Sequence, residues 1–235
     1  MLSDIAGWID GITASCVVIF GIIFGFYFLY KAKKLNAKIL SYLALANIFA
    51  GLLFLGVFLD FIYVVTFNQN FNNTYGLVGI LSYIWLAPTI ITATYIGVNI
   101  INPKSKWFIF SISIILSIIF EVLMFFDPLS TFQFNPPPAL GTGLIDYNLQ
   151  SLSPGGILTA IMILFIMVIL GFGFLIKGIK ATGVIRKKFF LLSIGSFCFC
   201  VFGMLEGLTA PGIALIFVRV GFLSSFWFMY FGLKS

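Results

Sequence analysis

The sequence contains no histidine and few charges, with only 13 basic and seven acidic residues among its 235 positions. Soluble domains carry about 25% charged residues, whereas this chain has 9% and a mean hydropathy of +1.17. Several apolar runs exceed the length of about 18 residues that indicates a membrane helix. The shortage of charge excludes a soluble enzyme, a disordered chain and a secreted disulfide scaffold, and it predicts an all-α, multi-pass membrane protein.

The absence of histidine removes the most common metal ligand and the usual acid–base group near neutral pH. Nucleophiles that depend on a neighbouring histidine are excluded with it. The three cysteines, Cys16, Cys198 and Cys200, lie in apolar stretches and are typical of small packing residues. We therefore expect no metal site, no cofactor and no catalytic residues, and we do not expect an enzyme.

Seven apolar stretches are long enough to cross a bilayer core of about 30 Å. They cover residues 12–30, 39–62, 76–100, 107–126, 155–176, 189–208 and 212–233. A cleaved signal peptide begins with basic residues, and residues 1–11 contain none, so we expect the first span to be retained. The chain is predicted to be a single transmembrane domain, 1–235, with seven helices.

The basic residues are divided unevenly between the two sides of the predicted bundle. Twelve of the 13 fall between spans one and two, three and four, or five and six, or in the C-terminal tail. The positive-inside rule places these connections in the cytoplasm, so the N-terminus is expected outside and the C-terminus inside the cell membrane. The basic excess therefore predicts contact with the lipid bilayer and no nucleic acid. The long outer loop, 127–153, contains a Pro triplet and is interpreted as a cap over the outer mouth or as a tether.

Spans one and five are similar in sequence. Residues 13–34 and 159–180 align without a gap at nine identical positions. The polar matches are Thr13/Thr159, Lys31/Lys177 and Lys34/Lys180. The similarity predicts a parallel 3+1+3 repeat, with halves of about 11–101 and 155–235 and a linking helix at 107–126, related by an axis along the membrane normal. The alternative is an accidental match between two helices rich in Phe, Ile and Gly.

The 3+1+3 pattern resembles the broad superfamily of microbial rhodopsins and small sugar transporters of the SWEET type. The last two helices also resemble the seven-helix sensor region of some prokaryotic histidine kinases and of stand-alone archaeal membrane proteins. The residues that carry this resemblance are Arg186-Lys187-Lys188, Glu206, Arg219 and Tyr230-x-Gly232. The resemblance implies a receptor-like or sensor-like role. The chain departs from these families because 212–233 contains no lysine for a retinal Schiff base, no Pro-Gln pair occurs and no kinase is attached.

Four charged residues lie within predicted spans or near their ends. They are Arg219, Glu206, Glu121 and Asp60. An ionised group in hydrocarbon costs about 2.5–3.5 kcal/mol on insertion scales, so each should face the bundle interior and find a partner. Glu206 precedes Arg219 by one tight turn and is the easiest partner. The four residues are interpreted as an ion pair that locks helices together, as an outward-facing pocket for a small ligand, or as a contact with lipid headgroups.

Smaller polar residues form stripes on two of the predicted helices. Ser113 and Ser117 share a face of span four, and Thr92, Tyr95 and Asn99 share a face of span three below Pro88. These five are candidates for the lining of an internal polar path. The alternative is packing between helices, where small residues allow close approach and hydroxyls form hydrogen bonds.

Three functions fit this description. We favour a stand-alone receptor-like or sensor-like module that binds a small molecule from outside, because polar residues gather in the outer half. A cytoplasmic or membrane protein partner would then read the inner side. The alternatives are a small-solute transporter or channel, and an accessory subunit of a membrane complex. The faces Gly21-x-x-x-Gly25 and Gly203-x-x-x-Gly207 are also compatible with an oligomer.

Overall fold

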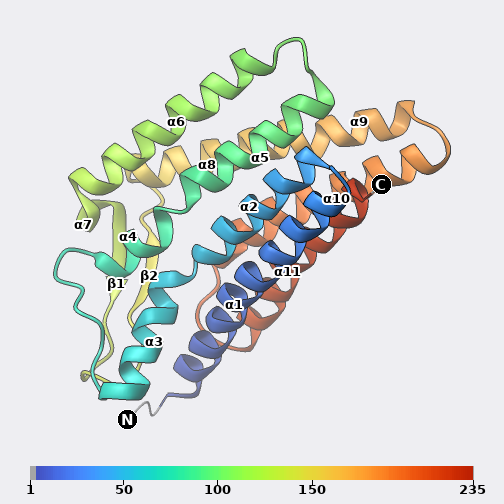
Figure 1. Cartoon of the computed structure of the whole chain (residues 1–235). Helices are drawn as coiled ribbons and strands as arrows, with labels where there is room; N and C mark the ends of the chain where they lie inside the picture. The colour runs from blue at the N-terminus through green and yellow to red at the C-terminus, as the bar shows by residue number, and fades with distance from the viewer. Residues whose placement is uncertain (1–3, 235) are drawn as a thin grey trace.

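A computed structural model describes residues 4–234 as a bundle of long helices (Figure 1). Within these residues, six helices are long and apolar enough to cross a membrane. They are α1 (Ile5–Lys34), α4 with α5 (Leu77–Ile101), α6 (Lys106–Phe126), α8 through α9 (Pro154–Lys180), α10 (Gly183–Glu206) and α11 (Ile213–Leu233). The prediction of a mostly helical membrane protein is confirmed at this level.

Two of these helices contain an irregular turn. The first consists of α4 (Leu77–Tyr83) and α5 (Leu86–Ile101), which meet just before Pro88. Pro88 lies in the first turn of α5, where its missing N–H leaves no hydrogen bond unmade. The second consists of α8 (Pro154–Ile166), the π-helical turn η1 (Met167–Phe172) and α9 (Gly173–Lys180). Both breaks fall inside predicted spans without shortening them.

The predicted span 39–62 is bent in the structure. It consists of α2 (Lys38–Leu52) and α3 (Leu55–Phe67), whose axes differ by 46° and which reach a membrane-spanning length only as a pair. Between them, the N–H of Phe54 donates to the carbonyl of Gly51 at 3.3 Å, which tightens the chain into a turn. The bend directs Phe54 and the residues around it towards the interior of the bundle.

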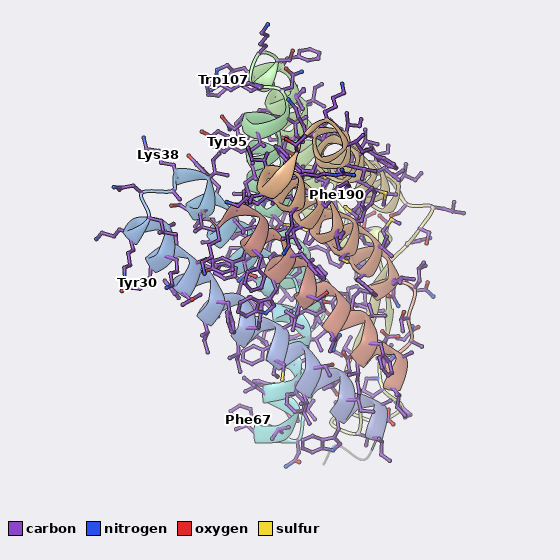
Figure 2. All side chains as sticks on the ribbon, turned by 90° about the vertical axis from the view of Figure 1, so that its right-hand side faces the viewer. Tyr30, Lys38, Phe67, Tyr95, Trp107 and Phe190 are labelled. Atoms are coloured by element: carbon purple, nitrogen blue, oxygen red, sulfur yellow. The ribbon has the colours of Figure 1, made fainter. Side chains whose placement is uncertain are left out.

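The bundle has two chemically different ends. The basic end carries the short connections 35–37, 102–105 and 181–182 together with the C-terminus. The opposite end, which we call the hairpin end, carries the start of α1, the turn 207–212 and the segment 127–153. Figure 2 shows Lys38 and Trp107 towards the basic end and Phe67 at the hairpin end.

The segment 127–153 has a fold of its own. It contains α7 (Pro128–Thr131) and the strands β1 (Phe132–Asn135) and β2 (Asp146–Leu149), which pair antiparallel with Phe132 opposite Leu149. The Phe132 ring is buried and lies 5.2 Å from the ring of Tyr83. The segment is therefore a folded cap and not a plain tether. Among the described residues, its two strands are where the structure differs from the predicted all-α fold.

The first two helices approach each other at backbone distance. A Cβ atom placed on Gly21 would come within 2.7 Å of the Cα atom of Gly51, and the reverse is also true. Beside this contact, Asn47 Nδ2 donates to the carbonyl of Gly21 at 3.0 Å in a buried position. Close approach of this kind is how membrane helices gain packing without a hydrophobic driving force between them.

Gly51→Ala is expected to destabilise the protein by about 1–3 kcal/mol, because the added methyl group must push α1 and α2 apart. The measurement is the thermal unfolding midpoint of purified protein in detergent. Gly203→Ala is the matched control, since a Cβ atom there meets only one atom, at 3.8 Å. Equal midpoints for the two variants would contradict this account of the packing.

Candidate functional site

A cavity of about 300 Å³ lies between the helices at the hairpin end. Small-molecule sites in proteins typically occupy roughly 300–1,000 Å³, so this space is at the lower end of that range. Residues of α3, α5, α8, α10 and α11 form its walls, Asp10 of α1 lies on one side, and residues 145–149 of the cap cover it. The cavity is therefore shared by both halves of the chain.

Arg219 of α11 is the cation of this cavity, and its side chain is only 4% exposed. Its Nη2 lies 2.6 Å from Oδ1 of Asp10 and 2.8 Å from Oε1 of Glu206. Its Nε also donates to Glu206 Oε1, at 3.1 Å. The guanidinium thus joins α1 to α10 and α11. We refer to Asp10, Glu206 and Arg219 as the ion cluster.

The donors of Arg219 are all occupied. Besides the carboxylates, Nη1 donates to the backbone carbonyl of Asp10 at 2.7 Å and to the hydroxyl of Thr13. A guanidinium has five N–H donors, and these five contacts use each of them. The ring of Phe54 lies 5.0 Å from the guanidinium carbon, a distance at which the ring quadrupole attracts the cation. The buried charge of Arg219 is fully compensated.

The carboxylates of the cavity are not fully compensated. Asp10, Glu206 and Asp146 all line it, against one arginine. Glu206 Oε2 is buried without any hydrogen-bond partner. An unsatisfied buried acceptor costs about 1–3 kcal/mol and more when it is charged. Within residues 4–234, no group of three His, Cys, Asp or Glu side chains is placed to hold a metal ion.

The remaining walls are largely apolar and aromatic. The rings of Phe54 and Phe222 lie 5.7 Å apart, and those of Phe222 and Phe199 lie 5.3 Å apart. Phe199 and Phe222 lie towards the basic end from Glu206 and Arg219 on the same two helices, and Gly203, where a Cβ atom would meet only the Phe222 ring at 3.8 Å, leaves space open. The site combines one charged wall with an aromatic floor, which suits a molecule that has a polar head and an apolar body.

Asp60 fixes the cap to the bundle. It lies on α3 with no exposed surface, and its carboxylate accepts hydrogen bonds from the N–H groups of Phe71 at 2.7 Å and Ile145 at 2.8 Å. Asn70 donates to both oxygens of the same carboxylate, at 3.2 and 3.3 Å, and to the carbonyl of Gly143 at 2.9 Å. One buried acid therefore connects two segments of the hairpin end that are far apart in the sequence.

Tyr147 anchors the cap at a second point. Its hydroxyl donates to Ser82 Oγ at 2.6 Å, and the same oxygen accepts the N–H of Gly56 at 2.9 Å. Burial raises the pKa of the Tyr147 hydroxyl well above its ordinary value, so this group remains a neutral donor. Together with the Asp60 contacts, this hydrogen bond holds β2 over the cavity.

The structure separates the four charged residues that the sequence grouped together. Of the three acids proposed as partners of Arg219, Glu206 contacts it. Asp60 bonds instead to the cap, and Glu121 lies on α6 outside the cavity lining, with its Oε2 buried and unpaired. The structure does not bring Asp60 or Glu121 into contact with Arg219, because Asp60 accepts the N–H groups of Phe71 and Ile145 and α6 packs against α5 and α8.

The predicted polar path along spans three and four is not formed. Ser113, Thr92 and Asn99 donate to carbonyls of their own helices, at 2.8, 2.7 and 2.7 Å. Tyr95 packs against Tyr42, with ring centres 4.2 Å apart, and Ser117 is buried without a hydrogen-bond partner. None of these five described side chains lines the cavity. The contacts of these five residues agree better with packing between helices than with the lining of a polar path.

Asp10 and Thr13 are functional candidates that the sequence reasoning missed. The first predicted span begins at residue 12, which leaves Asp10 in the outer N-terminal segment of the prediction. The helix in fact begins at Ile5, where the Asp4 side chain caps it by accepting the N–H of Ala6 at 3.0 Å. The missed signal was this N-cap aspartate, which places Asp10 and Thr13, three residues apart, on one face of a helix.

Arg219→Gln is expected to destabilise the protein by about 3–5 kcal/mol, because it leaves the buried carboxylate of Asp10 and the partly buried carboxylate of Glu206 without their cation. The thermal unfolding midpoint in detergent measures the effect. Arg186→Gln is the control: this exposed arginine contacts the Phe190 ring at 5.5 Å, and such contacts contribute about 0.5–1 kcal/mol. Similar losses in both variants would show that the ion cluster is not a stabilising centre.

Asp60→Asn is expected to loosen the cap while the helices stay folded. The amide keeps one acceptor oxygen and replaces the other with an NH2 group, so either Phe71 or Ile145 loses the acceptor of its N–H group. Hydrogen exchange at the amide that loses its acceptor should accelerate by at least about tenfold, the equivalent of ~1.4 kcal/mol. Asp127→Asn, at the exposed start of α7, is the control. Unchanged exchange at both Phe71 and Ile145 would refute the role of Asp60.

Comparison with known proteins adds no family to this description. No protein-family model matches the chain, and no curated protein or solved structure matches it significantly. The resemblance to seven-helix sensor regions and to the rhodopsin and SWEET superfamily therefore stays a prediction. The function has to be argued from the cavity, the ion cluster and the cap.

Proposed function

We propose that the chain is a receptor-like or sensor-like membrane module that binds a small molecule from outside the cell membrane. The observation that supports this most strongly is the cavity of about 300 Å³, with a buried ion cluster on one wall and a folded cap above it. A cap held by Asp60 and Tyr147 is an ordered boundary of a site, which a loop serving only to connect two helices does not need.

The proposal includes seven membrane spans, with the bent pair α2 and α3 as the second. The basic end then faces the cytoplasm, because it carries the lysine-rich connections, and the hairpin end with the cavity faces outside. The 3+1+3 repeat is supported by a similar contact in each half. Asn47 of span two donates to the carbonyl of Gly21 in span one, and Ser193 of span six donates to the carbonyl of Gly171 in span five. The two glycines are not equivalent, because Gly171 aligns with Gly25, so the contacts differ by one helical turn.

The region between the cavity and the basic end favours binding over transport. Another cavity in this region holds only about 20 Å³ and is lined almost entirely by apolar side chains such as Ile166, Leu170 and Phe226. A buried water needs two to four polar partners, which the lining of this cavity does not offer to a polar solute. The connections at the basic end are only a few residues long, so any signal would pass to a partner protein.

Gly203→Cys tests whether the cavity opens to the outside. The variant is made in a background with Cys16→Ser, Cys198→Ala and Cys200→Ala, so that it carries the single thiol. A Cβ atom fits at this position. We expect charged, membrane-impermeant methanethiosulfonate reagents, added outside, to modify it within minutes in cells or oriented vesicles. Mass spectrometry of the purified protein measures the modified fraction.

Ser196→Cys in the same background is the matched control. Ser196 lies on the same helix, towards the basic end, and has no exposed surface. We expect no modification there from either side. If no reagent modifies Gly203→Cys, the outward-facing site is refuted. If reagents reach Ser196→Cys from both sides, the chain is a transporter or channel instead of a receptor-like module.

A further inference from the structure

The ion cluster restricts which ligand the cavity can accept. An anionic ligand would need free donors, and all five N–H groups of Arg219 already bond to Asp10, Thr13 and Glu206. A carboxylate or phosphate could bind Arg219 only by displacing one of its partners. That exchange would leave a buried carboxylate without its cation, which is strongly unfavourable. The chemistry of the cavity therefore disfavours an anion.

The acceptors of the same cluster have capacity left. Glu206 Oε2 is buried with no donor, and within residues 4–234 no group donates to Asp10 Oδ2, while Oδ1 of that residue contacts Arg219. Asp146 adds a third carboxylate at the rim. The cavity thus offers negative charge and free acceptor oxygens.

The rest of the lining describes the body of the ligand. Phe54, Tyr83, Phe199 and Phe222 surround the space next to the cluster, and Tyr147 lies above it. Aromatic faces attract cations within about 6 Å and favour flat or apolar groups. Arg219 already uses the face of Phe54 in this way, at 5.0 Å. The space suits a compact molecule with one ring or a short branched chain.

We infer that the ligand is a small organic cation, an amine whose ammonium group donates to Asp10 and Glu206 while its apolar body occupies the aromatic part of the cavity. This inference rests on the proposed function and specifies its ligand class. The ammonium supplies the positive charge that one arginine between two carboxylates does not provide. A proton bound to one of the acids would balance the same charge, but it would leave the 300 Å³ of apolar space without an occupant.

Charge-selective modification of Gly203→Cys tests the sign of the site. The probes are a trimethylammonium-ethyl and a sulfonato-ethyl methanethiosulfonate, and Ala210→Cys, on the exposed turn outside the cavity, normalises their intrinsic rates. We expect the ratio of the cationic to the anionic modification rate to be about tenfold higher at Gly203→Cys than at Ala210→Cys. The reason is that a cleft of one charge sign concentrates counter-ions. Glu206→Gln and Asp10→Asn should each lower this preference several-fold, and Asp127→Asn should not.

A protection experiment keeps the inference testable even if the cluster variants fail to fold. Uncharged methyl methanethiosulfonate modifies Gly203→Cys in the presence of 2-phenylethylammonium or of 3-phenylpropanoate, which have similar size and opposite charge. We expect protection by the ammonium compound and none by the carboxylate. Protection by the carboxylate, by both equally or by neither would overturn the ligand class while leaving an outward-facing cavity. A complete lack of modification by every reagent, or modification of Ser196→Cys from both sides, would overturn the proposed function itself.

Discussion

The buried guanidinium of Arg219 is the interaction on which the arrangement of the bundle depends. It lies among apolar helices, where an unpaired charge costs several kcal/mol, so the fold must bring acceptors to it. Glu206 comes from the preceding helix across a short turn, but Asp10 comes from the first helix, 209 residues away in sequence. Satisfying Arg219 therefore closes the bundle by holding its first helix against its last.

Two buried aspartates use different partners and so perform different tasks. Asp10 is compensated by a cation and fixes helix to helix. Asp60 is compensated by N–H groups of the backbone and of Asn70, and it fixes the cap to a helix. The bend between α2 and α3 links the two tasks, because it places Phe54 beside Arg219 and Asp60 beneath the cap. The cavity lies between these two anchors.

Hydropathy predicted the membrane helices well because it reports directly on contact with lipid. The Glu206–Arg219 contact was the easiest pairing to predict, because one short turn separates the helices that carry the two residues. The cap, Asp10 and the position of Glu121 did not follow. Pairing of β1 with β2 depends on a ten-residue loop, and the rotation of α6 that separates Glu121 from Arg219 depends on its packing against α5 and α8. Contacts between residues far apart in the chain produce no periodic pattern in a single sequence.

The stoichiometry of the ion cluster favours a binding role over a purely structural one. An ion pair that only holds helices together needs one acid for one arginine. Each further buried carboxylate adds a desolvation cost that packing does not offset. Here Asp10 and Glu206 share one cation, a third acid lines the same cavity, and one carboxylate oxygen has no partner. Folded chains tolerate such local deficits mainly where function requires them. Under the proposed function, a cationic ligand from outside the chain would balance the excess negative charge beside this open, aromatic space.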